Sequence, residues 1–167
     1  FQQELRERIL GMVAHATVSG IDGPVEDWRR AVAMAGEDPR VLGAAPYVET
    51  ESLIEGRQRR GALLRGVLPE LEPKVTELAS KMKLGEFTDL RPGEFNILLG
   101  SELAMLLGVG PGDQVNVFIS QATSTPIGAL PRAKRFTVAG VFEAGAQEYD
   151  LGLAVIHLQD AQALARM

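Results

Sequence analysis

Two histidines are the side chains of this 167-residue chain best suited to acid–base or metal chemistry. His15 lies within the apolar run Met12–Gly20, and His157 ends another apolar run near the C-terminus. The spacings H-x-x-x-H and H-E-x-x-H, which place two imidazoles around one zinc ion, do not occur in the sequence. A metal site or a Ser-His pair stays an open alternative. The favoured interpretation is that each histidine lies in or at the end of a strand with its ring nitrogens satisfied.

The other motifs that could do chemistry are better explained by structural roles. The segment "GVGPGD", Gly108–Asp113, lacks the Lys-Ser/Thr of a phosphate-binding P-loop and follows a helix instead of a strand, so we interpret it as a helix stop and a turn. Glu49, Glu51 and Glu55 alternate along a predicted strand, which is typical of one solvated face. "RQRR", residues 57–60, is a charged turn tip. The sequence therefore predicts a protein that is not an enzyme and has no cofactor or metal.

Composition limits the classes of protein further. Apolar residues make up 46% and charged residues 23%, and the net charge of −5 argues against nucleic acid as a partner. Cysteine is absent, which excludes disulfides and thiolate chemistry. No apolar run reaches the roughly 18 residues that a membrane helix needs. Because the chain opens on "FQQELRERIL" and ends within "DAQALARM", we expect a domain cut from a longer protein.

The periodicities that must position these groups predict a mixed α+β domain. Strands are expected where apolar and β-branched residues cluster, and helices where apolar residues recur at helical spacing. The expected strands are 12–20, an extended stretch 41–56 broken at Pro46 with a return after a turn at 56–61, 95–100, 114–120, 134–145 and the run before residue 158. The expected helices are 24–36, 73–85, 101–108 with Ser101 as N-cap, and a last one with Asp160 in its first turn.

One connection between two predicted strands is unusually long. The segment "SQATSTPIGALPRAKRF", Ser120–Phe136, separates strands that a tight turn of two to five residues would ordinarily join. Pro126 and Pro131 fix their own φ angles, and Ile127 and Leu130 stand between them. This pattern predicts a stiff, partly apolar protrusion that loses little entropy on binding a partner. The alternative is a loop that folds back over a sheet edge.

Several blocks of the sequence together indicate a known family. The blocks are "FQQELRERILGMVAHATVSG", "AAPYVETESLI", "LRGVLPELE", "LLGSELAMLLGVGPGDQVNVFIS" and "TPIGALPRAKRFTVAGVFEAGAQEYDLGLAVIHLQDAQAL", in order across nearly the whole chain. The chain resembles the periplasmic domain of the LolC/LolE lipoprotein-releasing family, the membrane subunits of an ABC transporter of the macrolide-exporter type. The resemblance implies a MacB-like ectodomain between two membrane helices. Its α/β Porter-type subdomain would take residues 1–50 and 136–167, and a β-rich Sabre-type subdomain residues 51–135.

The resemblance also implies partners and a binding loop. A LolA-type periplasmic carrier would receive outer-membrane lipoproteins, with a LolE-type membrane subunit and a LolD-type ATPase in the full complex at the inner membrane. A Hook-like loop, residues 120–133, would enter the carrier, and its pattern favours the LolC branch or a merged homologue. The isolated domain would be monomeric. The residues expected to bind the carrier are Thr125, Pro126, Ile127, Gly128, Leu130, Pro131, Arg132, Lys134 and Arg135.

Two other classes of protein stay open. One is a mechanotransmission ectodomain of a related exporter or of a cell-division ABC-type membrane protein, in which the proline-rich loop would have no assigned task. The other is a small-molecule sensor, which would need an apolar pocket with converging polar groups.

Overall fold

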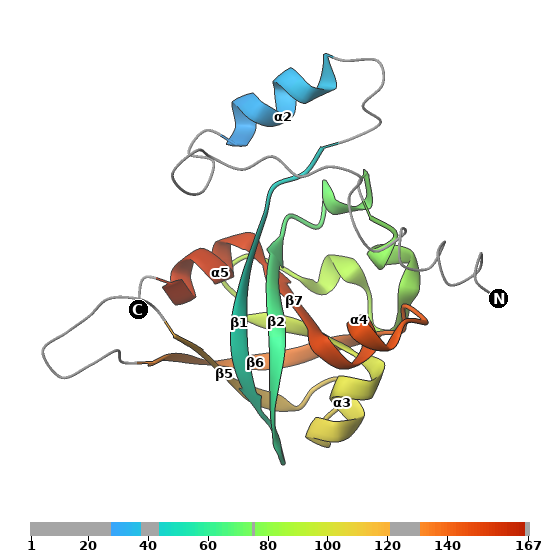
Figure 1. Ribbon diagram of the computed structural model, residues 1–167, viewed down its shortest axis with the longest axis vertical. Helices are drawn as coiled ribbons and strands as arrows, with labels where there is room; N and C mark the ends of the chain where they lie inside the picture. The colour runs from blue at the N-terminus through green and yellow to red at the C-terminus, as the bar shows by residue number, and fades with distance from the viewer. Residues whose placement is uncertain (1–27, 38–43, 75, 121–130, 166–167) are drawn as a thin grey trace, which may run out of the picture.

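The computed structural model describes residues 28–37, 44–74, 76–120 and 131–165, and these form one curved, mixed sheet with helices around it (Figure 1). The sheet has seven strands in the order β3-β6-β4-β7-β2-β1-β5. The strands are β1 (Tyr47–Glu55), β2 (Arg59–Val67), β3 (Met82–Leu84), β4 (Asn96–Gly100), β5 (Gln114–Ser120), β6 (Pro131–Phe142) and β7 (Leu153–His157). The helices are α2 (Trp28–Gly36), α3 (Ser101–Leu107), α4 (Gln147–Gly152) and α5 (Leu158–Ala165), with short 3-10 helices at Glu72–Lys74, Leu78–Lys81 and Phe87–Asp89.

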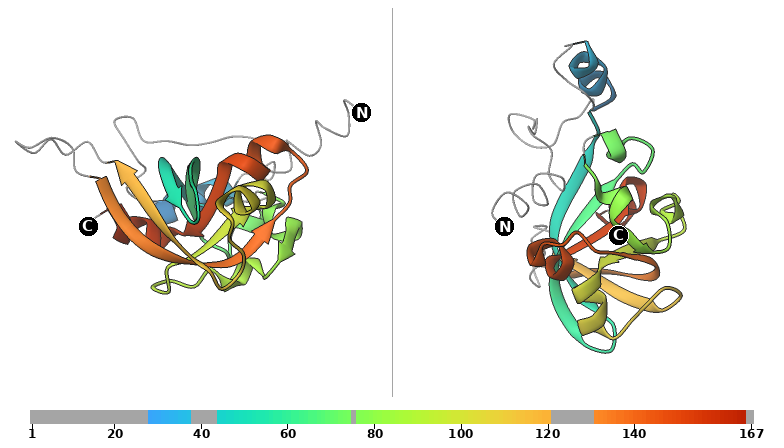
Figure 2. Two further views of the ribbon diagram at one scale, coloured as in Figure 1. Left: turned by 90° about the horizontal axis from the view of Figure 1, so that it is seen from below. Right: turned by 90° about the vertical axis from the view of Figure 1, so that its right-hand side faces the viewer.

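The length of β6 closes this sheet on itself. The first half of β6 pairs with β5, and its second half pairs with β4 and β3. Since β5 also pairs with β1, the ladder runs from β6 through β4, β7, β2, β1 and β5 back to β6. The strong curvature that closure requires is visible in both views of Figure 2. The sheet therefore has an inner and an outer face, each with its own core.

Strand alternation divides the apolar side chains between these two faces. On β4, Ile97 and Leu99 join the inner core, whereas Leu98 joins the outer one. All five residues of β7 are buried because this strand is covered on both sides. The outer core also includes Leu78 and Phe87, which belong to the 3-10 helices between β2 and β4. Strands buried on both faces explain the continuous apolar runs in the sequence.

Glycines cap both ends of helix α3. α3 ends at Gly108, which adopts a left-handed conformation with φ 72° and donates its backbone N–H to the carbonyls of Ala104 and Met105. The predicted stop at this glycine is confirmed. Gly100, and not Ser101, is the N-cap residue, so that detail of the prediction is wrong.

One predicted helix is absent, and one helix was not predicted. The described residues between 73 and 85 do not form an α-helix: a short 3-10 helix covers Leu78–Lys81, and Met82–Leu84 becomes strand β3 on the edge of β6. The apolar spacing of this segment suits a helix, but pairing with β6 and packing against the outer core override it. The unpredicted helix is α4, whose first turn is held by the Asp150 carboxylate that accepts N–H bonds from Ala144 and Gly145.

The sheet runs through the boundaries that the family resemblance implies for two subdomains. The boundary at residues 50/51 falls inside β1, and the boundary at 135/136 falls inside β6. Strand β2, from the middle of the chain, pairs with β7 near its C-terminus. The division into subdomains stays a prediction, and these two limits do not coincide with borders between strands.

Candidate partner-binding site

The strands that carry the predicted binding loop form a regular antiparallel hairpin. β5 and β6 pair from Gln114 opposite Thr137 to Ser120 opposite Pro131. The hairpin thus continues as paired strands up to residue 120 and resumes at residue 131, so β6 begins earlier than the sequence predicts. The predicted carrier-binding residues Thr125, Pro126, Ile127, Gly128 and Leu130 lie outside the described residues.

The three predicted basic residues lie on β6, but on two different faces. Arg132 and Lys134 share the side of the strand that further along carries buried Phe136. The Arg132 guanidinium donates a hydrogen bond to the Ala165 carbonyl at the end of α5, and the Lys134 ammonium lies 4.6 Å from the Phe95 ring centroid. Arg135 is exposed on the opposite face. The structure therefore does not gather these three residues into one basic surface.

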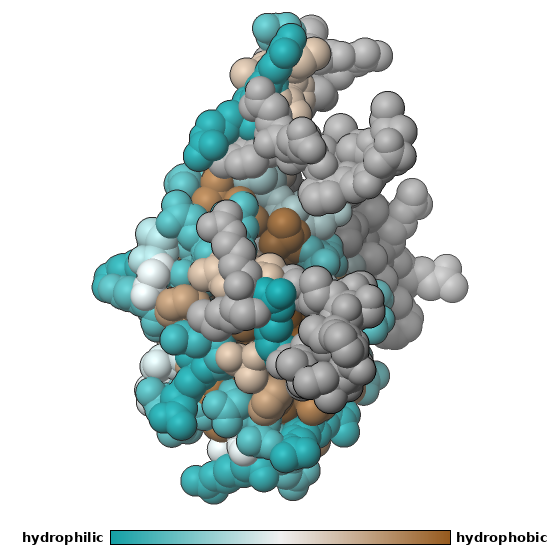
Figure 3. All heavy atoms as spheres, turned by 90° about the vertical axis from the view of Figure 1, so that its left-hand side faces the viewer, coloured by the Kyte–Doolittle hydropathy of each residue, from teal (hydrophilic) through white to brown (hydrophobic). Residues whose placement is uncertain are grey.

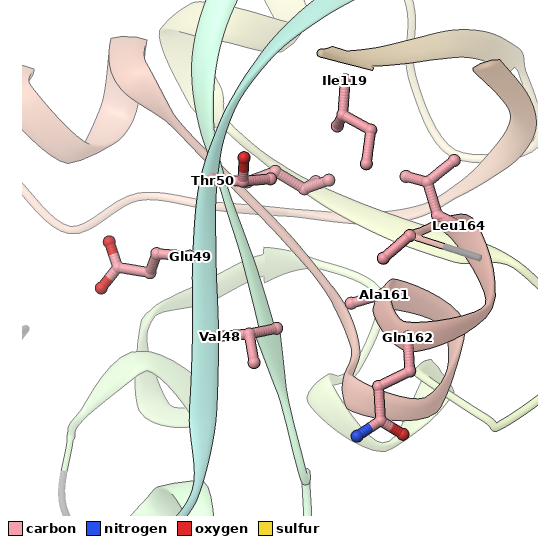
Figure 4. A pocket seen from close by; sticks show the side chains of 9 residues that line it. Val48, Glu49, Thr50, Ile119, Ala161, Gln162 and Leu164 are labelled. Atoms are coloured by element: carbon pink, nitrogen blue, oxygen red, sulfur yellow. The ribbon is translucent and has the colours of Figure 1, made fainter. Parts of the chain in front are cut away.

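A pocket that the sequence analysis did not predict lies at the base of this hairpin. Its volume is about 160 Å³, and it opens between β1 and α5. Figure 4 shows Val48 on β1 directed toward α5, with Ile119 of β5 above, whereas Glu49 points to the other side of the strand. The lining residues are Val48, Glu49, Thr50, Leu64, Ile119, Ala161, Gln162, Leu164 and Ala165.

The pocket lies next to the β5–β6 hairpin, because Ile119 of β5 is one of its lining residues. Ile119 lies opposite Arg132 in the β5–β6 register, and Arg132 contacts the last residue of α5. On the side of the molecule toward which the hairpin points, apolar surface interrupts the polar surface (Figure 3). The sequence contains little sign of this pocket, because its lining comes from β1, β2, β5 and α5, and only the closed sheet brings these elements together.

A buried charged cluster lies behind β1. Arg65 is 7% exposed, its guanidinium lies 3.3 Å from the Glu49 carboxylate and 5.9 Å from the Tyr47 ring centroid, and its Nε has no hydrogen-bond partner among the described residues. Glu72 is also buried, and this burial raises the pKa of its carboxyl, although the Arg65 charge and a hydrogen bond from Thr76 oppose the effect. The cluster links β1, β2 and the first 3-10 helix.

The pKa of one neighbour of this cluster is perturbed in the same direction. Burial raises the pKa of the Tyr149 phenol, and the Glu148 charge adds to the effect. Tyr149 lies on α4 and packs against the outer core.

Other polar residues that could do chemistry have structural partners instead. The His157 ring accepts a hydrogen bond at Nδ1 from the Gln159 backbone N–H at 3.0 Å, which confirms the strand-end interpretation for this residue. His15 lies outside the described residues. The Asp113 carboxylate accepts an N–H bond from Gly110, so "GVGPGD" is a turn as predicted. In the described ranges, no three carboxylate or imidazole groups gather as metal ligands would.

The predicted carboxylate row on β1 has basic partners on β2. The Glu55 carboxylate accepts a hydrogen bond from Arg59 and another from Asn116 at 3.4 Å, and the Arg59 bond lowers its pKa most. Glu49 pairs with Arg65 in the same way.

None of the helices in the described part of the chain is long and apolar enough to cross a bilayer.

Comparison with known proteins first defines the class. A family model described as the MacB-like periplasmic core domain matches residues 1–166, and the chain belongs to this family. Among relatives, the chain is 54% identical over 167 residues to "Lipoprotein-releasing system transmembrane protein LolC" of Xylella fastidiosa strain 9a5c and 42% identical over 168 residues to the LolC protein of Neisseria meningitidis. Both alignments cover all of this chain and 40% of the relative.

The similarity to LolE is weaker. A LolE protein of Haemophilus influenzae is 26% identical over 167 residues, with 97% of this chain and 40% of the relative covered. The resemblance to the LolC/LolE periplasmic domain is thereby confirmed, and the chain spans about 40% of the length of these relatives. A solved permease domain of Porphyromonas gingivalis aligns with a TM-score of 0.48 and 14% identity, over 92% of this chain and 57% of the other.

Proposed function

We propose that this chain is the periplasmic domain of a LolC-type subunit in a lipoprotein-releasing ABC transporter. The observation that carries the proposal is the 54% identity to a LolC protein over the full chain, compared with 26% to a LolE protein. In this function the domain holds no reacting group. It recruits a LolA-type carrier so that lipoproteins leave the inner membrane, while a separate LolD-type subunit supplies ATP hydrolysis and a LolE-type subunit completes the membrane part.

We further propose that the loop between β5 and β6 docks the carrier. Two features support this: the paired arms end at Ser120 and Pro131, and the connecting residues contain Pro126 beside the apolar Ile127. Proline limits the conformations that the loop must lose on binding, which reduces the entropic cost of a small interface. A small interface with moderate affinity suits a carrier that must be caught and then released.

The experiment is a calorimetric titration of purified carrier into the chain and its loop variants. Pro126→Gly frees the backbone, and we expect a loss of affinity of several-fold to about tenfold. Pro126→Asp should weaken binding more, because an apolar contact would have to desolvate the carboxylate. Pro92→Asp, the same change at an exposed proline outside the loop, is the matched control. Parental affinity of a folded Pro126→Asp variant would remove this loop as the docking element.

A further inference from the structure

Phe95 stands at the turn into β4, and its backbone is held from two sides. Its N–H donates a hydrogen bond to the Asp160 carboxylate at 3.1 Å, and its carbonyl accepts one from the Thr137 N–H of β6 at 3.0 Å. Its φ of 52° lies in the left-handed region, which glycine enters without strain and phenylalanine does not. A phenylalanine in this conformation indicates that its ring has a task that glycine could not perform.

The Phe95 ring lies against strand β6, which is one arm of the docking hairpin. It meets the Phe136 ring edge to face, with the centroids 5.5 Å apart and the planes at 75°. The Lys134 ammonium stands over the Phe95 ring, 4.6 Å from its centroid. Lys134 and Phe136 are two residues apart on β6, so their side chains project from the same face of the strand. The Phe95 ring thus packs against the inner core and also holds a cation.

Of the three basic residues predicted to bind the carrier, Lys134 is the one whose donors remain available. Arg132 donates to the Ala165 carbonyl, and Arg135 lies on the opposite face of β6. Among the described residues, no carboxylate forms an ion pair with the Lys134 ammonium. An aromatic face attracts an ammonium group while the N–H groups that point away from the ring stay free for another acceptor.

We propose that Phe95 is a positioning residue for carrier binding: its ring holds the Lys134 ammonium at the base of the docking loop, where this ammonium pairs with a carboxylate of the carrier. The inference rests on the proposed function, in which Lys134 binds a LolA-type carrier. A lysine side chain loses rotamer freedom when it forms an ion pair. A ring that already restrains the ammonium reduces this loss, so Phe95 acts through Lys134 and does not itself contact the carrier.

Calorimetric titration of the purified carrier into variants of the 167-residue chain tests this role. Phe95→Leu keeps an apolar side chain but removes the ring, and it should weaken binding about threefold at about 50 mM salt. Phe95→Tyr keeps the ring and should stay within about 1.5-fold of the parent. At about 500 mM salt the loss in Phe95→Leu should shrink, because salt screens the charge pair that the ring supports.

A double-mutant cycle separates positioning from packing. Lys134→Gln should weaken binding about fivefold, and adding Phe95→Leu to it should change binding by less than about 1.5-fold, because no ammonium is left to position. Phe87→Leu, the same change in the outer core, is the matched control, which should lower stability without changing affinity. Thermal melts show that the variants are folded. Losses that simply multiply in the double variant would overturn the proposal.

Proton NMR of the free chain tests the contact without the carrier. The methylene protons beside the Lys134 ammonium should resonate upfield of those of exposed Lys83, because they lie near the face of a ring, and Phe95→Leu should remove this difference. The absence of an upfield shift, or parental affinity of a folded Phe95→Leu variant, overturns the proposal while the docking function stands. A parent chain that does not bind the carrier overturns the docking function, and this inference with it.

Discussion

At the scale of single residues, buried carboxylates hold the connections between strands. Asp160, 2% exposed, accepts hydrogen bonds from the backbone N–H groups of Gly93 at 2.7 Å and Phe95 at 3.1 Å. Phe95 has a φ of 52°, which is unusual for a residue other than glycine. The carboxylate at the start of α5 thus fixes the turn that leads into β4.

Removal of this carboxylate should cost much of the chain's stability. Asp160→Ala leaves two part-buried N–H groups without an acceptor, and we expect a loss of about 2 kcal/mol in the free energy of unfolding. Asp160→Asn keeps one acceptor oxygen and should lose about half as much. Urea denaturation measures both. Equal stability of the alanine variant and the parent would mean that water satisfies these N–H groups.

The buried Glu72 predicts a pH dependence of stability. Because burial raises the pKa of Glu72 above its ordinary 4.5, the folded chain holds this proton to higher pH than the unfolded chain. The stability that this proton contributes is present at low pH and is lost as pH rises through the raised pKa. Arg65, Thr76 and Glu49 are the groups that act on this carboxyl.

The isosteric substitution Glu72→Gln should remove this loss. Relative to the parent, the variant should gain stability as pH rises from 4.5 through the raised pKa of Glu72, as followed by thermal melts at increasing pH. Glu70→Gln, at an exposed neighbouring position, is the control and should show no such trend. A parallel pH profile of parent and Glu72→Gln chains would contradict the prediction.

At the scale of elements, the sequence predicts strands better than the segments that connect them. Alternation and β-branched runs predicted β1, β2, β4, β5, β6 and β7, because each strand buries one or two faces. Residues 73–85 were predicted as a helix because their apolar spacing has no local sign of the edge pairing with β6. Helix α4 escaped prediction because its stability depends on the Asp150 contacts to the preceding turn and not on apolar periodicity.

Two adjacent leucines on α3, one exposed and one buried, should differ in their contribution to stability. Apolar spacing on α3 and the apolar run of β5 predict Leu103, Leu106 and Val117 as core residues. Leu103 and Val117 are buried, but Leu106 is 40% exposed, so that prediction is wrong, and its neighbour Leu107 is fully buried. Leu107→Ala should therefore destabilise the chain by roughly 2–5 kcal/mol, and Leu106→Ala by less than about 1 kcal/mol. Urea titrations compare them. Similar losses for both variants would mean that α3 is rotated relative to the inner core.

At the scale of the whole molecule, closure of the sheet determines which parts of the candidate site could be predicted. The position of the hairpin loop followed from local sequence, since two strands flank two prolines. The pocket could not be predicted, because four elements distant in sequence meet there only when β5 pairs with both β1 and β6. The division of the basic residues between two faces follows from strand alternation once β6 is known to begin at Pro131.

Because Arg132 and Arg135 lie on opposite faces of β6, their substitution should have different effects. Arg135 is exposed, whereas Arg132 donates a hydrogen bond to the end of α5. Arg135→Gln should weaken carrier binding by a few-fold at about 50 mM salt, with the difference disappearing near 500 mM because salt screens exposed charges. Arg132→Gln should instead lower the melting temperature, since the last carbonyl of α5 loses its donor. Calorimetric titrations at both salt concentrations, with melts of the same samples, distinguish the two. A salt-independent loss of binding in Arg135→Gln would mean that this side chain makes a desolvated contact with the carrier and does not lie at the rim of the interface.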